Sequence, residues 1–440
     1  MAKPIVAIIG KPNVGKSTFF NYIVGKRISI VEDVPGVTRD RVYGEANWRG
    51  RNFTLIDTGG IEPKSDEIIL SKMRQQAELA MDTAHVILFI VDVKNGLTPQ
   101  DQEIAVMLRK TKKPILLVVN KVDNRNLPDN FYDFYELGLG EAHPISGVNG
   151  LGIGDLLDEI VSHFPANLDT EYAEDVTKVA IVGKPNAGKS SILNRLLGEE
   201  RVIVSPIAGT TRDAIDTYKE IAGKKYLFID TAGVRKKNKI EENIEKYSVI
   251  RSYTAIERAD VVLMVIDASE GISEQDSKIA GMAHDAGKCI VIVVNKWDLP
   301  EKDNDSIKKY TKQIREELPF MMYAPIIFIS ALTGQRFGQI KESIDYVIEQ
   351  AARRIPTGLL NDVIGEAVML NQPPSDKGRR LKVYYATQVG VKPPTFTIFV
   401  NSNELFHFSY QRYLENKIRE NFGFEGTPLV FKRREKGEKK

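Results

Sequence analysis

The chain has 440 residues, of which 42% are hydrophobic and 27% charged, and 61 Lys and Arg nearly balance 59 Asp and Glu. This composition indicates a globular protein of about three domains and excludes collagen, coiled coil and wholesale disorder. The lone cysteine, Cys289, cannot form an internal disulfide, and no apolar run approaches the roughly 20 residues that cross a membrane. We therefore expect a cytoplasmic protein that does not bind a membrane.

The sequence contains an internal repeat of one domain-sized unit. The segment 10–17 (Gly-Lys-Pro-Asn-Val-Gly-Lys-Ser) returns almost unchanged at 183–190, and four later motifs return in the same order. In each copy, short β-branched runs alternate with amphipathic stretches. The runs are 5–9, 53–56, 86–91 and 115–119 in the first copy, and 179–182, 226–229, 261–266 and 289–294 in the second. This alternation predicts two α/β domains, each a mostly parallel sheet with helices on both faces.

The remaining sequence sets the domain boundaries. We place the first domain at 1–165, an acidic linker at 166–176, the second domain at 177–352 and a small α+β domain at 353–440. In the last domain, helical patterns alternate with strand patterns in the order α-β-β-α-β. These elements are expected at 358–369, 381–387, 395–400, 410–421 and 429–431.

The C-terminal segment concentrates the positive charge. Residues 356–440 hold 14 Lys and Arg against nine Asp and Glu, which suits an RNA backbone. The final stretch 432–440 lacks apolar residues and is predicted to be a disordered basic tail. The aromatic side chains of this domain are expected mostly to fill its core. They are Tyr384, Tyr385, Phe396, Phe399, Phe406 and Phe408.

Each G-x-x-x-x-G-K-S segment lies between a strand and a helix, the context that a phosphate-binding loop requires. Lys16 and Lys189 are expected to reach the β- and γ-phosphates, and the hydroxyls of Ser17 and Ser190 to ligate Mg²⁺. A chance Gly-rich turn could give one match but hardly two in register. The loop residues expected at the nucleotide are Gly10, Lys11, Pro12, Asn13, Val14, Gly15, Lys16, Ser17, Gly183, Lys184, Pro185, Asn186, Ala187, Gly188, Lys189 and Ser190.

A second pair of motifs follows the next buried strand in each copy. Asp57 and Asp230 end those strands, where a carboxylate can hold Mg²⁺ directly or through water. Thr38 and Thr211, in polar loops, can complete the Mg²⁺ shell only when a γ-phosphate is present, although each could be an ordinary turn residue. The backbone N–H of Gly60 or Gly233 can meet that phosphate. Their neighbours at the nucleotide are Thr58, Gly59, Ile61, Thr231, Ala232 and Val234.

The N-K-x-D motifs predict which nucleotide base the two sites bind. Asp123 and Asp298 can each accept two hydrogen bonds from guanine, whereas adenine offers no such donor pair. The Lys121 and Lys296 stems can cover the base. A backbone amide beside Ser146 or Ser330 can face guanine O6. The four-residue motifs are Asn120, Lys121, Val122, Asp123 and Asn295, Lys296, Trp297, Asp298.

Both halves resemble TRAFAC-class GTPases of the Era-like group. Two such domains followed by a small α-β-β-α-β domain are similar to the bacterial ribosome-assembly GTPases of the EngA or Der family, over essentially the whole chain. The resemblance implies GTP hydrolysis to GDP with Mg²⁺, coupled to maturation of the large (50S) ribosomal subunit. It also implies a KH-like C-terminal domain, with that subunit and its rRNA as partners. We expect a monomer that binds no DNA.

The motifs also bear on the rate of hydrolysis. Ile61 and Val234 stand where a catalytic glutamine could orient water, so intrinsic turnover should be slow. In related GTPases an asparagine at the position of Asn13 and Asn186 helps to bind K⁺. The alternative is that these asparagines only stabilise the loop. Arg39 and Arg212, beside the loop threonines, are expected to structure their loops rather than act as arginine fingers.

Two features concern coupling between domains. The segment 234–250 begins with basic residues whereas the stretch after Ile61 is acidic, so we expect nucleotide to change the domain arrangement. The segment 423–426 has the spacing of the KH signature GXXG. Because it follows a helix and precedes a strand, we interpret it as a helix C-cap rather than an RNA clamp.

Alternatives to a ribosome-assembly GTPase remain. A nucleotide-sensing RNA-binding scaffold could hydrolyse GTP only incidentally. A tRNA-modification GTPase would share the Asn-containing loop, but it would carry one GTPase domain and a C-terminal cysteine. This chain has two GTPase domains and no C-terminal cysteine. A membrane-remodelling GTPase is disfavoured because no basic amphipathic helix or lipidation signal is visible.

Overall fold

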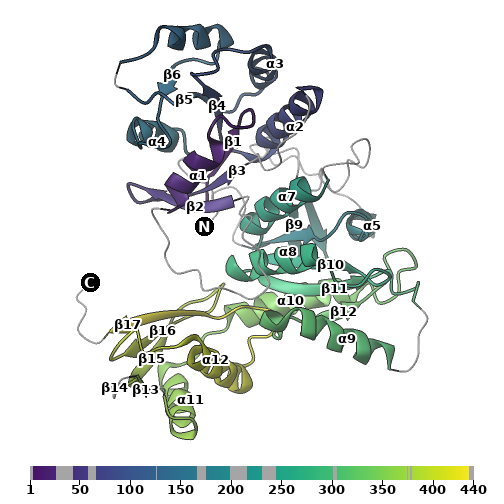
Figure 1. The fold of residues 1–440 in the computed structure, drawn as a ribbon. Coiled ribbons are helices and arrows are strands. Elements are labelled where there is room, and N and C mark those ends of the chain that lie inside the picture. The colour runs from purple at the N-terminus through teal and green to yellow at the C-terminus, as the bar shows by residue number, and fades with distance from the viewer. Residues whose placement is uncertain are drawn as a thin grey trace. The chain divides into compact units, whose positions relative to one another are not determined.

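The computed structural model describes residues 3–25, 43–57, 66–124, 126–165, 175–198, 216–229, 244–300, 305–373, 375–376 and 379–435 (Figure 1). The chain divides into two compact units, residues 1–172 and 173–440. Among the helices of the described residues, none combines the length and the apolar character that a membrane crossing requires.

The first unit is built on a six-stranded sheet with the order β2-β3-β1-β4-β5-β6. Neighbouring strands run parallel except for β2 and β3. The strands are β1 (Ile5–Ile9), β2 (Tyr43–Trp48), β3 (Arg51–Asp57), β4 (Val86–Asp92), β5 (Ile115–Asn120) and β6 (Ala142–Pro144). The helices are α1 (Lys16–Gly25), α2 (Asp66–Thr83), α3 (Pro99–Leu108) and α4 (Ile153–Ser162), with the 3₁₀ helix η1 (Asp129–Leu137).

The second unit repeats this sheet as β12-β11-β10-β7-β9-β8, again parallel except for its β8–β9 pair. Its strands are β7 (Val176–Val182), β8 (Thr217–Ile221), β9 (Lys224–Ile229), β10 (Val261–Asp267), β11 (Cys289–Asn295) and β12 (Ile326–Phe328). The helices are α5 (Lys189–Gly198), α7 (Ile244–Arg258), α8 (Glu274–Asp285), α9 (Ser306–Glu317) and α10 (Gln339–Ala352), with the 3₁₀ helix η2 (Pro319–Met321).

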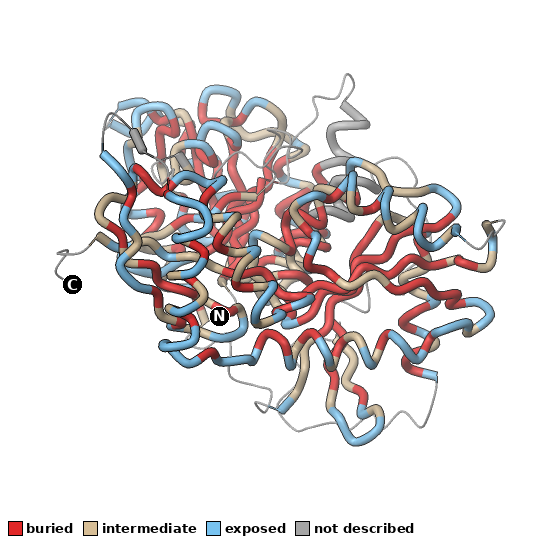
Figure 2. The backbone as a smooth tube through the Cα atoms, turned by 90° about the horizontal axis from the view of Figure 1, so that it is seen from below, coloured by how far each residue is buried: buried red, intermediate tan, exposed pale blue. Residues whose placement is uncertain are grey.

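Both faces of each sheet are covered, which is why the strands read as continuous apolar runs. All seven residues of β4 and of β10 are buried, and Figure 2 shows long extended segments of the chain coloured as buried. In the first unit, α1 and α4 share a core cluster with alternate residues of β1, while α2 packs on β1 and α3. The two predicted α/β domains are confirmed, although the antiparallel edge strands β2 and β8 were not expected.

The C-terminal part begins after α10 and follows the predicted order α-β-β-α-β. Its elements are α11 (Thr357–Leu370), β15 (Val383–Gly390), β16 (Thr395–Val400), α12 (Phe408–Phe422) and β17 (Val430–Glu435), with a short unpredicted hairpin of β13 (Ser375–Asp376) and β14 (Arg379–Arg380). The expected tail at 432–440 is wrong for its first four residues. They belong to β17, because six residues of this strand pair in parallel with β16 and their charged side chains can stay solvated.

The aromatic residues of this part divide between core and surface. Phe396 and Phe406 are buried, as expected. The same expectation is wrong for Tyr384, Tyr385 and Phe408, which are exposed.

The segment 423–426 docks the C-terminal part onto the second sheet. Gly423 has φ of 85° and its N–H donates to Arg419 O at the end of α12, so the predicted helix C-cap is confirmed. Gly426 O then accepts from Ile290 N at 2.7 Å, and Gly426 N donates to Tyr323 O at 2.7 Å. The start of β11 therefore has a hydrogen-bond partner in the C-terminal part.

Candidate nucleotide-binding sites

The asparagine of the N-K-x-D motif holds each phosphate-binding loop in place through a hydrogen bond. Asn120 Nδ2 donates to Val14 O at 2.7 Å, and in the second copy Asn295 Nδ2 donates to Ala187 O at 2.9 Å. The contact leaves no room for a side chain at Gly15, where a Cβ would lie 2.2 Å from Asn120 Nδ2. Gly15 also has φ of 94°, so both space and backbone conformation require glycine.

The loop lysines cross their own loops. Lys16 Nζ donates to Gly10 O at 2.8 Å and to Lys11 O at 2.5 Å. Lys189 Nζ makes the same two bonds, to Gly183 O and Lys184 O. Burial lowers the pKa of Lys16 to about 8, partly opposed by the Asp57 carboxylate. The ammonium therefore lies at the mouth of the loop, where it can meet a phosphate oxygen.

The structure brings together two of the three predicted Mg²⁺ ligands of the first copy, Ser17 and Asp57. Ser17 Oγ, at the start of α1, donates to Asp57 Oδ2, at the end of β3, over 3.0 Å. A hydroxyl beside a carboxylate offers the hard oxygen ligands that Mg²⁺ prefers, and phosphate oxygens and water usually complete such a shell. Elsewhere in the described residues, no group of three or more His, Cys, Asp or Glu side chains could hold a metal.

A part of the predicted site lies outside the described residues. This part comprises Thr38, Thr58, Gly59, Gly60, Ile61, Thr211, Asp230, Thr231, Ala232, Gly233 and Val234, together with Arg39, Arg212 and the linker residues 166–174. The pairing of Ser190 with Asp230 in the second copy therefore stays a prediction.

The loop asparagines Asn13 and Asn186 share one conformation. Both have φ of 65°, in the left-handed region that asparagine tolerates, and both are exposed. Neither side chain makes a hydrogen bond with the described residues, so the amide oxygens are available to a ligand.

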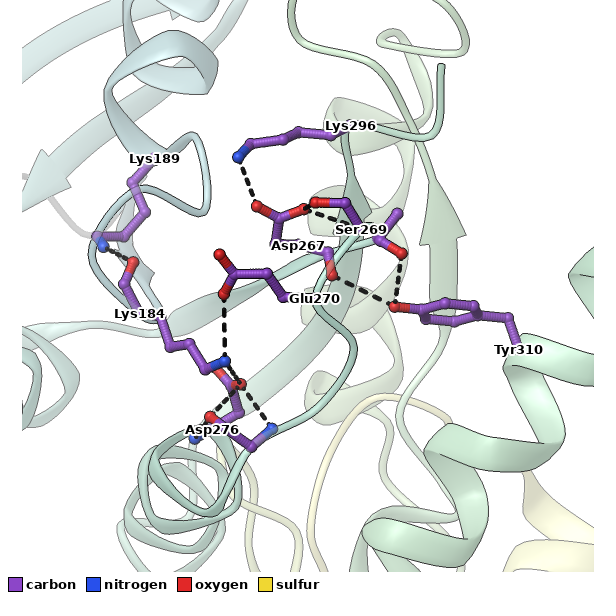
Figure 3. A network of polar contacts seen from close by, with 10 residues as sticks. Lys184, Lys189, Asp267, Ser269, Glu270, Asp276, Lys296 and Tyr310 are labelled. Atoms are coloured by element: carbon purple, nitrogen blue, oxygen red, sulfur yellow. Dashed lines mark hydrogen bonds and ion pairs between the residues drawn. The ribbon is translucent and has the colours of Figure 1, made fainter. Parts of the chain in front are cut away.

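A further tether of the loop was not apparent in the sequence. Lys11 Nζ donates to Thr98 Oγ1 at 2.7 Å and pairs with Asp101 Oδ2 at 2.9 Å, at the capped start of α3. In the second copy, Lys184 pairs with Glu270 at 3.5 Å and with Asp276 at 3.8 Å (Figure 3). The repeated capping sequences 98–101 and 273–276 were the available signal, since each places a buried Asp at the third helical position.

The lysines of the N-K-x-D motifs are held by aspartates at the ends of β4 and β10. Lys121 Nζ pairs with Asp92 Oδ2 at 2.6 Å, and Lys296 Nζ with Asp267 Oδ2 at 2.5 Å (Figure 3). Lys121 and Lys296 both have positive φ, near 68° and 60°. Each ion pair fixes the position of the ammonium and thereby of the aliphatic stem, which was predicted to cover the base.

The two carboxylates that were predicted to read the base differ in their surroundings. Asp123 accepts from Lys94 Nζ at 2.8 Å and from Ser146 Oγ at 2.9 Å, and these bonds lower its pKa. Asp298 Oδ1 is buried and has no hydrogen-bond partner among the described residues. A buried acceptor without a donor is costly, so a ligand with two N–H donors would be favoured there.

The amides predicted to face guanine O6 have partners within the protein. Gly147 N, which follows Ser146, donates to Asn120 Oδ1 at 2.9 Å, and Ala331 N, which follows Ser330, donates to Asn295 Oδ1 at 3.0 Å. Each amide thus lies beside its base motif, and a base oxygen would share or replace this bond.

The comparisons with known proteins agree with this geometry. Residues 5–121 and 178–296 both match the family model described as "50S ribosome-binding GTPase", and residues 354–434 match "KH-domain-like of EngA bacterial GTPase enzymes, C-terminal". The chain is therefore a GTPase of the 50S ribosome-binding family, with two GTPase domains and a KH-like C-terminal domain.

The full-length relatives narrow the class. GTPase Der of Ruminiclostridium cellulolyticum is 63% identical over 99% of both chains, and GTPase Der of Acetivibrio thermocellus is 62% identical over the same shares. GTPase Der of Alkaliphilus oremlandii is 63% identical, again over 99% of both chains. The chain belongs to the GTPase Der (EngA) family.

Proposed function

We propose that this GTPase acts in assembly of the large ribosomal subunit, and that the nucleotides at its two sites gate its binding to rRNA. The support comes from membership of a 50S ribosome-binding GTPase family and from the positive charge of the C-terminal part. The observation that carries the nucleotide assignment is the buried Oδ1 of Asp298, which has no hydrogen-bond partner among the residues that the structure describes, in the same domain as a phosphate-binding loop.

In this proposal, GTP lies across the carboxyl ends of the parallel strands. The glycine loops direct backbone N–H groups at the phosphates, and Lys16 and Lys189 pair with the β- and γ-phosphates. Asp123 and Asp298 accept the guanine N–H groups. Ser17 with Asp57, and Ser190 with Asp230, would hold Mg²⁺, which neutralises charge on the phosphates when bound.

Hydrolysis then depends on how the switch residues meet the γ-phosphate. Thr38 and Thr211, with the N–H groups of Gly60 and Gly233, are proposed to order around the triphosphate and to relax around GDP. The exposed amide oxygens of Asn13 and Asn186 would hold K⁺, whose charge would take the place of an arginine finger. Because no glutamine orients the water, turnover without a partner should be slow.

Guanine recognition by Asp298 has a direct test. With the first site disabled by Asp123→Asn, we expect Asp298→Asn to lose GTP binding by at least about a hundredfold, since buried donors then face a donor. Xanthosine triphosphate, which presents an acceptor at that position, should bind the doubly substituted chain. Equilibrium titration with labelled nucleotides gives both values. Unchanged GTP affinity in the doubly substituted chain would show that Asp298 does not read the base.

A further inference from the structure

The three-stranded sheet of the C-terminal part has one face that helices cover. Ala386 of β15 and Phe396 and Ile398 of β16 lie in a core cluster with residues of α11 and α12. Figure 1 shows both helices on the same side of β15, β16 and β17. The opposite positions of the three strands form the open face of this sheet.

A β-bulge places two consecutive tyrosines on this open face. The register runs from Val383 opposite Val400 directly to Tyr385 opposite Phe399, so Tyr384 is the extra residue. Such a bulge opposes two residues to one and redirects a side chain. Tyr384 and Tyr385 are accordingly 45% and 44% exposed, although they are neighbours in a strand.

Cationic side chains lie next to the aromatic side chains of the open face. The Tyr385 ring stacks on Phe399 with centroids 4.2 Å apart and planes 12° from parallel. Phe399 lies opposite Arg434 of β17, and the adjacent row on the same face ends at Lys432. Arg434 and Lys432 are both exposed.

The charge of the face is of one sign. The positions that face away from the helices in the three described strands carry no carboxylate, and among them only Thr397 is buried. They are Tyr384, Tyr385, Thr387, Val389, Thr395, Thr397, Phe399, Val430, Lys432 and Arg434. Glu435 follows Arg434 but lies at the alternate position, where its Oε1 accepts from Asn403 N at 2.7 Å. The face thus combines exposed rings with solvated cations.

We propose that this open face, from Tyr384 and Tyr385 across Phe399 to Arg434 and Lys432, is a stacking platform for single-stranded RNA. Bases can stack on exposed aromatic rings while phosphates pair with flanking cations, and a duplex keeps its base faces covered. The inference rests on the proposed function, because it assigns a place and a kind of RNA to the rRNA contact. The GXXG-like segment 423–426 is not part of it, since that segment docks onto β11.

The test uses the full chain and a fluorescein-labelled eight-nucleotide single-stranded RNA, with an RNA hairpin of the same composition as the paired probe. Tyr385→Leu and Phe399→Leu remove rings but keep apolar bulk, so the fold should survive, as circular dichroism can verify. Each is expected to weaken single-strand binding roughly tenfold. Arg434→Gln should lower the salt dependence of binding. Phe408→Leu, which removes an exposed ring at the start of α12, is the matched control and should bind as the parent does.

The outcomes separate the platform from the proposed function. Weaker binding of the single strand by the ring variants, with hairpin binding unchanged, supports the platform. Parental affinity for the single strand in both ring variants overturns it, even if the parent still cosediments with large ribosomal subunits. Loss of subunit binding in ring variants that keep full affinity for the RNA means that the face contacts a protein, which also overturns it. If the parent fails to bind subunits, the proposed function fails instead.

Discussion

At the level of single residues, the two proposed guanine sites are not equivalent. In the first site Asp123 is already paired with Lys94, an exposed lysine, whereas position 269, which corresponds to Lys94, is a serine that bonds Asp267 instead. In the proposed complex, guanine competes with the Lys94 ammonium for Asp123, whereas Asp298 Oδ1 has no hydrogen-bond partner within the described part of the chain. The difference predicts weaker guanine binding at the first site than its motif alone would give.

The pairing of Lys94 can be tested by making the first site resemble the second. Lys94→Ser should raise the affinity of the first site for GDP a few-fold, since an exposed pair contributes little, and the gain should shrink in high salt. Titration in an Asp298→Asn background isolates the first site. Lys94→Arg serves as the control that keeps the charge. No gain in Lys94→Ser at low salt would show that the lysine does not compete with the base.

The phosphate-loop asparagines lead to a second prediction at this scale. Hydrolysis of GTP should be faster in KCl than in NaCl at equal ionic strength, because the exposed amides of Asn13 and Asn186 are proposed K⁺ ligands. Phosphate release measured in both salts gives the ratio, and Asn186→Ala should lower it for the second site. Equal rates in the two salts would remove the cation from the mechanism.

At the level of elements, the C-terminal part and the second GTPase domain share partly buried polar contacts. His284 of α8 hydrogen-bonds Tyr323 over 2.8 Å, and the Arg419 guanidinium of α12 lies 4.5 Å from the centre of the Tyr323 ring. Burial, with Arg419 and Arg412 nearby, lowers the pKa of His284 to about 4. This histidine is therefore neutral at neutral pH, and protonating it would place a cation beside two others.

The contact predicts an acid-sensitive second unit. Since the pKa of His284 is depressed by folding, its contribution is complete above its unfolded value near 6.5 and is lost as pH falls toward 4. The loss could reach about 3 kcal/mol of unfolding free energy. His284→Gln, which cannot be protonated, should flatten the pH dependence of denaturant unfolding between pH 7 and 5. The same slope in parent and variant would contradict the assignment.

Local sequence was enough to predict the positions of the elements that form the candidate nucleotide sites. The phosphate loops and N-K-x-D motifs follow buried strands, so their positions at one edge of a parallel sheet could be predicted from Gly10 to Ser17 and from Asn120 to Asp123. The tether of Lys11 to Asp101 and the pair of Lys94 with Asp123 join residues separated by 90 and 29 positions. The capping sequence marks Asp101 as the start of a helix, but no local pattern names either lysine as a partner. Nor could alternation predict the bulge at Tyr384, because an extra residue breaks the period of two.

Over the full chain, two candidate nucleotide sites are combined with one basic C-terminal part. The C-terminal part and the second GTPase domain form one compact unit, and residues 1–172 form the other. We propose that GTP in these sites rearranges the domains and so controls access of the C-terminal part to rRNA. Such binding should depend steeply on salt, because phosphate contacts release counterions.

The most direct test is cosedimentation of the full chain with purified large ribosomal subunits in three nucleotide states. We expect strong association with a non-hydrolysable GTP analogue, weak association with GDP, and a steep fall of both as salt rises. Asp123→Asn with Asp298→Asn should lose the response to the guanine analogue and regain it with the xanthine analogue. Equal association with the analogue, with GDP and without nucleotide would contradict the central claim that GTP gates binding to the subunit.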